Sequence, residues 1–282
     1  MKSPRNLQRM VPLLAAAGLF FSSLTLSAQQ PPAPGGGAPA QGGQGAPGGP
    51  GGRGGGRGMN MTPPAPDDLV GFTSIFDGKT LTNWDGDPRF WRVENGTIIG
   101  QSTPEKIVNP NSFLIWRGGI LKNFELKIDY RFTSGENGNS GVQYRSKEMP
   151  EVGKWVLAGY QADMDPIHRN TGLLYEERGR GFASRPGSIT RRVEGGAAKL
   201  IGSTGELDAI KAAAMKPSGE WHTYHIIAKE NVITQILNGR IINILIDDEP
   251  EKRAMEGLLG LQIHQGPPMQ IEFRNVYLKN LP

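Results

Sequence analysis

Apolar and polar residues alternate with a period of two along many short stretches of this chain from residue 72 onward. The clearest stretch is 124–132, in which Phe124, Leu126, Ile128, Tyr130 and Phe132 alternate with charged residues. This pattern predicts a β-strand with one buried face and one solvent-facing face. By the same criterion we expect further strands at 72–76, 141–145, 159–164, 222–229, 258–264 and 270–278.

Two Asn-Gly pairs join neighbouring strand patterns. Asn95-Gly96 lies inside 93–98, and Asn238-Gly239 joins VITQIL to RIINILI. Asn-Gly readily supplies the two positive φ angles of a type I′ turn, so both pairs predict β-hairpins. The one helical pattern, ELDAIKAAAM at 206–215, stands shortly before Pro217. Many short strands, tight turns and one short helix predict an all-β fold, a two-sheet antiparallel jelly-roll sandwich with one inserted helix.

The first 28 residues have the pattern of a secretory signal peptide. Three basic residues precede the apolar stretch VPLLAAAGLFFSSLTLSA, which ends at Ala28 before Gln29. A basic start, an apolar core and small residues at the end predict cleavage between these two residues. A retained membrane anchor is the alternative, but the stretch contains Pro12 and falls short of the roughly 20 apolar residues that a span needs. We therefore expect no integral membrane span after cleavage.

Residues 29–66 consist almost entirely of Gly, Pro, Ala and Gln. Such a composition cannot bury apolar surface, and it predicts a disordered tether ahead of one folded domain at 67–282. Arg53 and Arg57 stand among glycines as in some RNA-binding segments, but two arginines are too few to support that reading. The chain has no cysteine, which excludes a lipid-anchoring cysteine and disulfides. An exported protein without disulfides fits a periplasmic or extracellular location in a bacterium.

The net charge of +4 comes from the N-terminal part of the chain. Five of the 31 basic residues fall in 1–66, which holds no acidic residue, so residues 67–282 are close to neutral. A near-neutral domain is a poor electrostatic partner for nucleic acid, and we expect no nucleic-acid binding.

Polar pairs stand two positions apart on three of the expected strands. Their side chains alternate with apolar residues, so each pair should project from one face of its strand. If the strands share a curved sheet, the pairs cover one concave surface, and residues of the following loop reach its edge. The strand residues are Gln143, Arg145, Gln161, Asp163, Gln262 and His264, and the loop residues are Glu176, Glu177 and Arg178.

Each of these residues also has an ordinary structural explanation. Arg145 and Asp163 could form a cross-strand ion pair of at most about 1 kcal/mol, and His264 could cap the loop before Gly266. Trp155 lies in the polar run EVGKWVLAG and is a candidate platform for stacking a sugar. His168 lies in a loop and could contact a substrate or a metal. No phosphate-binding glycine loop, Gly-x-Ser-x-Gly elbow or HExxH motif supports another chemistry.

Five blocks in this order closely resemble the 3-keto-disaccharide hydrolase family, formerly a domain of unknown function. They are NSGVQYR, GYQAD, TGLLYEERGRG, GEWHTYHIIAKENVITQILNGR and GLLGLQIHQGPPMQIEFRNVYLKNL, and the resemblance spans 72–281. It implies a concanavalin A-like lectin or glucanase fold. Many relatives have Glu where Gln161 stands and Gln where Asp163 stands, which moves the carboxylate along the strand and leaves the role of each position open.

The resemblance implies an enzyme that cleaves glycosides already oxidised to a ketone at C3. The ketone acidifies the C2 proton, so the C1 substituent can leave by elimination, and water then adds to the glucal. The reaction needs a base near C2, an electrophile for the enolate oxygen and an acid for the leaving oxygen.

We expect His264 or Asp163 to act as the base. Arg145, or a divalent metal such as Mg, Ca or Mn, would stabilise the enolate. The metal candidates are Glu176, Glu177 and Asp163. Contacts to the sugar are expected from Gln143, Gln161, Gln262, Arg178, Trp155 and His168.

The alternative is a non-catalytic carbohydrate-binding module with the same fold. A binding module would spread its polar pairs along an open groove with exposed tryptophans, whereas an enzyme would gather them in a pocket.

Overall fold

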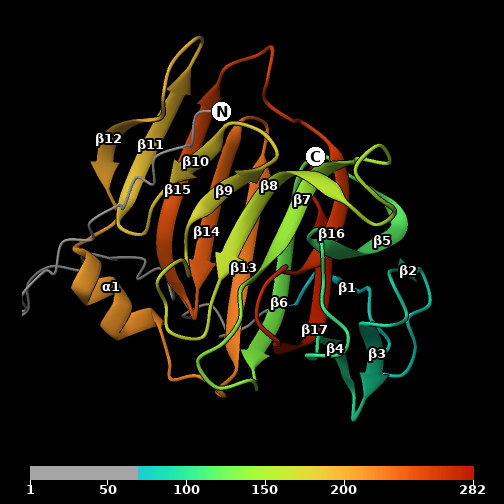
Figure 1. The fold of residues 1–282 in the computed structure, drawn as a ribbon. Helices are drawn as coiled ribbons and strands as arrows, with labels where there is room; N and C mark the ends of the chain where they lie inside the picture. The colour runs from blue at the N-terminus through green and yellow to red at the C-terminus, as the bar shows by residue number, and fades with distance from the viewer. Residues whose placement is uncertain (1–68) are drawn as a thin grey trace, which may run out of the picture. The chain divides into compact units, whose positions relative to one another are not determined.

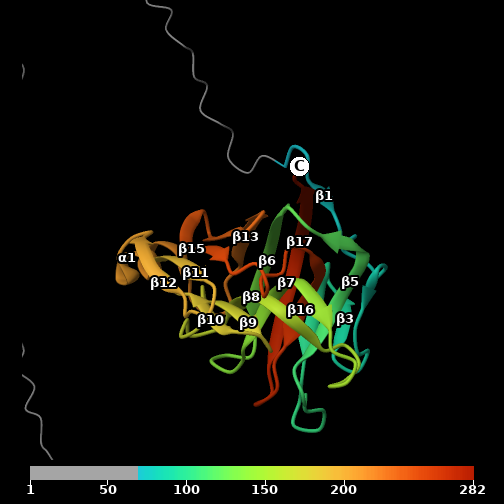
Figure 2. The same ribbon diagram turned by 90° about the horizontal axis from the view of Figure 1, so that it is seen from above.

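The computed structural model describes residues 69–282, which form two β-sheets packed face to face. Figure 2, seen along the layers, shows one sheet with β13, β6 and β17 above the other with β8, β7 and β16. The predicted signal peptide at 1–28 and tether at 29–66 lie outside the described residues. Among residues 69–282, no helix has the length and apolar character needed to cross a membrane.

The larger sheet has ten strands, and β1 (Thr73–Ser74) pairs with its strand β17. In spatial order its other strands are β12 (Lys199–Ser203), β11 (Ser188–Val193), β15 (Arg240–Asp248), β14 (Val232–Leu237), β13 (His222–Lys229), β6 (Phe124–Phe132), β17 (Gln270–Asn280), β4 (Thr97–Gln101) and β3 (Trp91–Glu94).

The smaller sheet has seven strands and lies in front of the larger one in Figure 1. Its order is β10 (Gly181–Ser184), β9 (Leu174–Glu177), β8 (Leu157–Met164), β7 (Ser140–Glu148), β16 (Gly257–Ile263), β5 (Ser112–Leu121) and β2 (Trp84–Asp85). The pairings are antiparallel except for the parallel pair β11 and β15. The all-β sandwich predicted from the sequence is therefore confirmed.

Alternation along the strands places the core between the sheets. Leu126 and Ile128 of β6, Tyr144 of β7 and Leu261 of β16 are all fully buried there. The ring of Tyr144 packs against that of Phe124 from the other sheet, with centroids 5.9 Å apart. Burial of these side chains supplies the main driving force for joining the two sheets.

The turn and helix predictions are also confirmed. Asn95 and Gly96 have φ angles of 49° and 78°, and Asn238 and Gly239 have 49° and 80°, as type I′ hairpins require. Helix α1 (Leu207–Ala214) follows β12 and lies at one side of the sandwich (Figure 1).

The alternation analysis missed several strands, of which β5 is the longest. Its start, SFLI, reads as a continuous apolar run because both faces of the strand are covered. Leu114 belongs to the core between the sheets, whereas Phe113 and Ile115 form a separate cluster with Leu157 on the outer face. A strand buried on both faces shows no period of two.

The hairpin of β7 and β8 bends over the outer face of the smaller sheet. Its register shifts between Tyr144 and Lys147, and Arg145 has a φ of 48°. Beyond this bulge the backbone oxygen of Trp155 accepts a hydrogen bond of 2.9 Å from the Phe113 amide on β5. A β-bulge bends the strand that carries it, and here the bend makes the outer face concave.

Candidate functional site

A hollow of about 320 Å³ lies on the concave outer face of the smaller sheet. Strands β8, β9, β10 and β16 supply its floor and sides, and the ends of neighbouring loops supply its rim. It is lined by Asn111, Asn139, Gln161, Asp163, Asn170, Tyr175, Glu177, Phe182, Gln262 and His264. Four of the strand residues expected on one polar surface therefore line one hollow, namely Gln161, Asp163, Gln262 and His264.

A chain of side-chain hydrogen bonds crosses the floor of this hollow. Gln262 Nε2 donates to Gln161 Oε1 at 3.1 Å, and Gln161 Nε2 donates to Asp163 Oδ1 at 2.6 Å. Strand β7 lies between β8 and β16, and it places Gly141 beneath this chain. A Cβ atom on Gly141 would come within 2.5 Å of the Gln161 side chain, so glycine is needed for Gln161 to reach across.

Asp163 is the one carboxyl on this floor with a strongly shifted pKa. Its side chain is buried, and burial raises its pKa from 3.8 to about 7, while the hydrogen bond from Gln161 opposes this rise. The negative charges of Glu177 and Asp165 raise the pKa further. Among the described residues, Asp163 Oδ2 accepts no hydrogen bond, so this oxygen is available to a bound molecule.

Gln262 brings to the hollow a second oxygen that lacks a hydrogen-bond partner among the described residues. Its Oε1 is fully buried and has no hydrogen-bond partner among residues 69–282. An unpaired buried amide oxygen costs free energy, which a donor such as a sugar hydroxyl would recover. Gln143 lies opposite Gln161 on β7 and is also fully buried, and neither polar atom of its amide has a partner in this part of the chain. It does not line the hollow, so the structure does not offer it as a direct sugar contact.

The expected placement of Arg145 on this surface is wrong. The bulge in β7 reverses the alternation, and the Arg145 side chain is only 2% exposed. Its guanidinium donates to the backbone oxygens of Lys122 at 2.6 and 2.8 Å and of Glu230 at 2.7 Å. Burial lowers its pKa, and its hydrogen bonds hold loops of the sandwich together. It cannot reach an enolate in the hollow.

Glu176 and Glu177 are neighbours on strand β9 and make different contacts, although both also line a further hollow with Arg145 and Arg178. Glu177 lines the hollow, and its Oε1 accepts a hydrogen bond of 3.2 Å from Asn111. Glu176 lies opposite Tyr160 and forms an ion pair of 2.6 Å with Arg180. The expectation that both glutamates reach the polar surface is therefore wrong for Glu176.

His264 stands at the rim of the hollow and is partly exposed. Its Nδ1 contacts the backbone oxygen of Gln265. A carbonyl oxygen can only accept, so Nδ1 carries the hydrogen and Nε2 is left without a partner among the described residues. Nε2 can therefore accept a hydrogen bond or a proton from a bound molecule.

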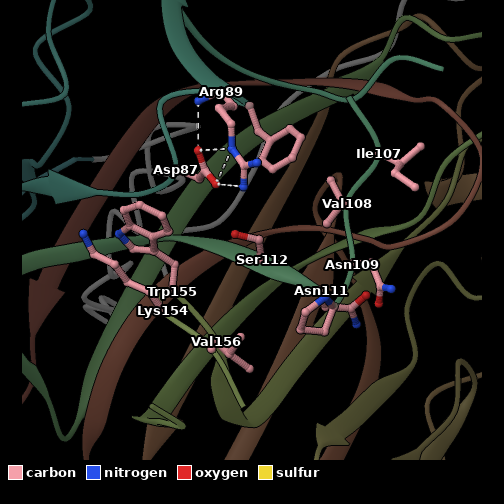
Figure 3. Close-up of a pocket in the computed structure, with 13 residues that line it drawn as sticks. Asp87, Arg89, Ile107, Val108, Asn109, Asn111, Ser112, Lys154, Trp155 and Val156 are labelled. Carbon is pink, nitrogen blue, oxygen red and sulfur yellow. Dashed lines mark hydrogen bonds and ion pairs between the residues drawn. The ribbon is translucent and has the colours of Figure 1, made fainter. Parts of the chain in front are cut away.

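Three other expected contacts lie elsewhere. Arg178 is exposed in the turn after β9 and lines a separate hollow beside Lys252. His168 contacts the backbone oxygen of Lys216 at 2.6 Å and packs against His222, with ring centroids 5.3 Å apart. Trp155 lines a neighbouring hollow, shown in Figure 3.

The sequence analysis missed several residues of the hollow. Asn139 and Asn170 line it, and among the described residues their side-chain amides have no hydrogen-bond partner. Asn170 is held in place by Asp165, whose carboxylate accepts hydrogen bonds from four backbone amides at 167 and 169–171. These backbone bonds to one buried aspartate appear only in the folded chain, so the sequence alone contains no signal for Asn170.

Aromatic side chains form the opposite side of the hollow. Tyr175 and Phe182 pair across β9 and β10 with ring centroids 5.2 Å apart, and Phe182 is 57% exposed. An exposed aromatic ring beside polar groups is a surface on which the apolar face of a sugar can stack.

The expected metal ligands do not come together. Glu176 binds Arg180, and within residues 69–282 no group of three His, Cys, Asp or Glu side chains is placed to hold a metal ion. Asp163 and Glu177 remain as acidic residues of the hollow. The residues present thus do not fit the predicted ligand set, and a divalent cation stays a prediction from the oxygen-rich character of the expected site.

The chain is similar to a curated protein and to several solved structures. A stretch of 96 residues, 32% of this chain, is 34% identical to a 3-keto-disaccharide hydrolase from Bacteroides thetaiotaomicron and spans 32% of that protein. The crystal structure of a "putative glycosyl hydrolase" from Parabacteroides distasonis matches 76% of this chain and 95% of its own, with 19% identity and a TM-score of 0.50. The carbohydrate binding module CBM66 from Bacillus subtilis matches 70% of this chain and 96% of its own, with 17% identity and a TM-score of 0.45.

The family comparison covers most of the folded part. Residues 71–279 match the model of the 3-keto-alpha-glucoside-1,2-lyase-like domain, so the match runs from before β1 to the last but one residue of β17. Membership suggests a domain that acts on carbohydrates. The chain belongs to the family of 3-keto-alpha-glucoside-1,2-lyase-like domains.

Proposed function

We propose that this chain is an enzyme that cleaves 3-keto-glycosides by elimination and hydration. A base removes the C2 proton, and the electron pair of the C2–H bond forms an enolate with the C3 ketone. The enolate collapses to the ketone, a C1=C2 double bond forms, and the C1–O bond breaks as the leaving oxygen gains a proton. Water then adds its hydroxyl to C1 and its hydrogen to C2, which gives a 3-keto sugar and a free alcohol.

The observation that carries this proposal is the carboxyl of Asp163 in the hollow. A pKa of about 7 leaves a substantial ionised fraction at neutral pH and makes the ionised form a far stronger base than an ordinary aspartate. Gln161 fixes one oxygen and leaves Oδ2 to take the C2 proton. This assigns the base to Asp163, and a His264 that carries a second proton, on Nε2, would give it to the leaving oxygen.

Side-chain amide groups take the role of stabilising the enolate oxygen, which the sequence analysis had given to Arg145. Asn139 and Asn170 line the hollow with unpaired side-chain amides, and an amide N–H can stabilise an enolate oxygen. Gln262 Oε1 would accept a hydrogen bond from a sugar hydroxyl, and Phe182 would pack on the apolar face of the ring. Every role that the reaction requires therefore has a candidate within one hollow.

The enzyme is favoured over a binding module by the arrangement of the tryptophans. No tryptophan is among the exposed large hydrophobic residues of 69–282, and Trp221 is covered by Arg131 and Arg274. The polar groups converge on one hollow instead of following an open groove. A binding module remains a distinct outcome of the experiment below.

We also propose export to the periplasm or the exterior of the cell, on the pattern of residues 1–28. The test is the N-terminal sequence of the protein recovered from cell fractions, which should begin at Gln29. Recovery of an intact N-terminus from the cytoplasm alone would contradict export.

The activity is tested with a 3-keto-glucoside in D₂O, with and without a chelator, by following aglycone release and deuterium at C2. D163N should lower kcat at least about 100-fold and suppress deuterium incorporation, since a general base contributes roughly 10²–10⁴-fold. D208N changes an exposed aspartate of α1 and is the matched control, with expected full activity. Binding of the substrate by the unmodified chain without turnover would overturn the enzyme and favour the binding module.

A further inference from the structure

The outer face of the larger sheet divides into a charged half and an apolar half. This face is on the opposite side of the sandwich from the concave face, and Figure 2 shows its strands β15, β13 and β6 in one layer. The outward side chains of β6 are Glu125, Lys127, Asp129 and Arg131. On β14 and β15 the outward side chains are instead mostly Ile, Val and Thr, and apolar residues continue onto β13 and β11.

The strand register joins these apolar side chains into one surface. Ile227 of β13 lies opposite Thr234 of β14, and Thr234 lies opposite Ile244 of β15. Ile244 in turn lies opposite Ile189 of β11. Residues directly opposite each other have Cβ atoms about 4.5–5.5 Å apart, so this row is continuous. We call the row and its apolar neighbours the apolar strip, which consists of Ile189, Ile227, Val232, Ile236, Ile244 and Ile246, all partly exposed.

Strand propensity alone does not account for the apolar strip. A single isoleucine on a solvent-facing strand needs no explanation, because β-branched residues favour strands and apolar atoms are common on surfaces. Neighbouring aliphatic side chains on four adjacent strands form a contiguous patch, however, and such a patch is typical of an interaction surface. Thr234, inside the strip, is uncharged, and the ion pair of Arg191 with Asp248 lies at its edge.

The side chains of the apolar strip suit a flat protein partner. Val and Ile have a restricted χ1 angle, so they lose little side-chain entropy when another surface covers them. The strip contains no aromatic ring on which a sugar could stack. Two β-sheets pack face to face at about 10 Å when aliphatic side chains of both interdigitate, so a second sheet is the complementary shape.

The apolar half is also large enough for a stable dimer. Five strands, from β12 to β13 in the sheet order, span about 24 Å at a spacing of about 4.8 Å. The nine residues of β15 extend about 30 Å at about 3.3 Å per residue. The resulting face of about 700 Å² is close to the roughly 800 Å² that each partner buries in an interface of standard size.

A second copy of the chain fits this face better than the chain's own tether. Residues 29–66 contain no Ile, Leu, Val, Phe, Tyr or Trp, so they have little apolar surface with which to cover the strip. A second copy supplies an identical strip. Its rim carries both signs of charge, with Lys229 next to Glu230 after β13 and Arg191 paired with Asp248. Two such rims can meet without the repulsion that a rim of one sign would cause.

We propose that two copies of this chain form a dimer by packing the apolar strips of their larger sheets against each other. In a two-fold dimer the same patch serves both partners, which the identical strips allow. The concave face of each copy stays open, because it belongs to the other sheet. The dimer therefore goes beyond the proposed function and does not depend on it.

The experiment is sedimentation equilibrium of the full chain over a dilution series, with thermal unfolding of each variant. The unmodified chain should have the mass of a dimer at about 100 μM, since interfaces of this size bind at micromolar strength or tighter. I244K places an ammonium at the centre of the strip and should raise the dissociation constant about 30-fold or more. T234K should act in the same direction, and it removes no aliphatic side chain that could be needed for folding.

L200K is the matched control. Leu200 of β12 is 71% exposed and lies opposite Thr190, whose buried side chain is on the other face of the sheet from the apolar strip. The same substitution there should leave the dissociation constant within about twofold.

Three results would overturn the dimer. One is a monomer mass for the unmodified chain at about 100 μM. Another is a dimer that I244K and T234K leave intact, because its contact would then lie elsewhere in the chain. The third is a dimer that L200K weakens as much as I244K does. The readout is a mass, so a chain that fails to cleave 3-keto-glucosides would contradict the proposed function and leave this test unchanged.

Discussion

Asn111 and Glu177 form a hydrogen bond across the concave face, with Asn111 Nδ2 donating to Glu177 Oε1 at 3.2 Å. Glu177 ends β9 and Asn111 precedes β5, and three strands, β8, β7 and β16, separate these two in the sheet. The bond can form because the sheet curves. Asn111 Oδ1 also accepts from the Gln265 amide at 2.8 Å, so one side chain ties the residue after His264 to β9.

We expect Asn111 and Glu177 to be energetically coupled. N111A and E177A should each lower the free energy of unfolding, and the double variant should lose less than the sum of the two by about 0.5–1.5 kcal/mol. Urea unfolding of the four proteins measures this coupling. If the two losses in unfolding free energy add strictly, the hydrogen bond between Asn111 and Glu177 contributes nothing to stability in solution.

The two adjacent glutamates should respond differently to the same substitution. E176Q weakens the contact with Arg180 in a buried ion-pair group that also holds Asp247, and we expect a loss of about 1–3 kcal/mol in unfolding free energy. E177Q changes the lining of the hollow and should mainly lower kcat/KM for a 3-keto-glucoside. Urea unfolding and steady-state kinetics on the same preparations check both.

Each of these variants is the matched control of the other, because the substitution is identical and the positions are neighbours. The opposite result, with E176Q impairing turnover at unchanged stability, would contradict the assignment of different contacts to these two glutamates.

Alternation could predict the sheet and much of the polar floor because the period of two is a property of the backbone. It brought Gln161, Asp163 and Gln262 to one face from strands far apart in sequence. It failed at Arg145, where the bulge inserts an extra residue and reverses the direction of every later side chain. The sequence analysis placed residues 176–177 in a loop, although they belong to strand β9. It therefore did not apply the alternation that gives these two glutamates different contacts.

The asparagines of the hollow carried no comparable signal. Asn111 and Asn139 stand directly before β5 and β7, and Asn170 lies in a loop. Outside a strand the backbone has no fixed period, so the direction of a side chain depends on tertiary contacts. The bound carboxylate of Asp165 orients Asn170, and only the folded backbone shows that contact.

Arg145 should matter for stability and not for chemistry. R145A removes a fully buried side chain and its hydrogen bonds to three backbone oxygens, those of Lys122, Glu230 and Ala254. We expect a loss of about 3 kcal/mol or more in unfolding free energy, with near-normal kcat per folded molecule at low temperature. K147A, at an exposed neighbour on β7, should leave stability within about 0.5 kcal/mol.

Thermal unfolding together with active-site titration separates these two effects. If R145A unfolds normally but loses turnover, Arg145 takes part in the reaction and its purely structural role is wrong.

Asp163 and Asp165 stand two positions apart and should have opposite effects on stability. The Asp165 carboxylate accepts four backbone hydrogen bonds, and an asparagine amide would turn its N–H groups towards two of those donors. D165N should therefore lower the unfolding temperature, and it should raise KM as Asn170 loses its support. Unchanged stability of D165N would contradict this account of the loop.

For Asp163 the sign of the pH dependence follows from its raised pKa. The folded state holds the proton up to about pH 7, whereas the unfolded chain releases it near 3.8, so this group makes the protein less stable as pH rises between those values. The difference corresponds to at most about 4 kcal/mol. D163N should consequently unfold at a higher temperature than the unmodified chain at pH 8, with the gap closing towards pH 4, while turnover of the unmodified chain rises through about pH 7. An unfolding temperature for D163N below that of the unmodified chain at pH 8 would show that the carboxylate is stabilised by contacts that this structure does not give it, and its role as the base would lose its physical support.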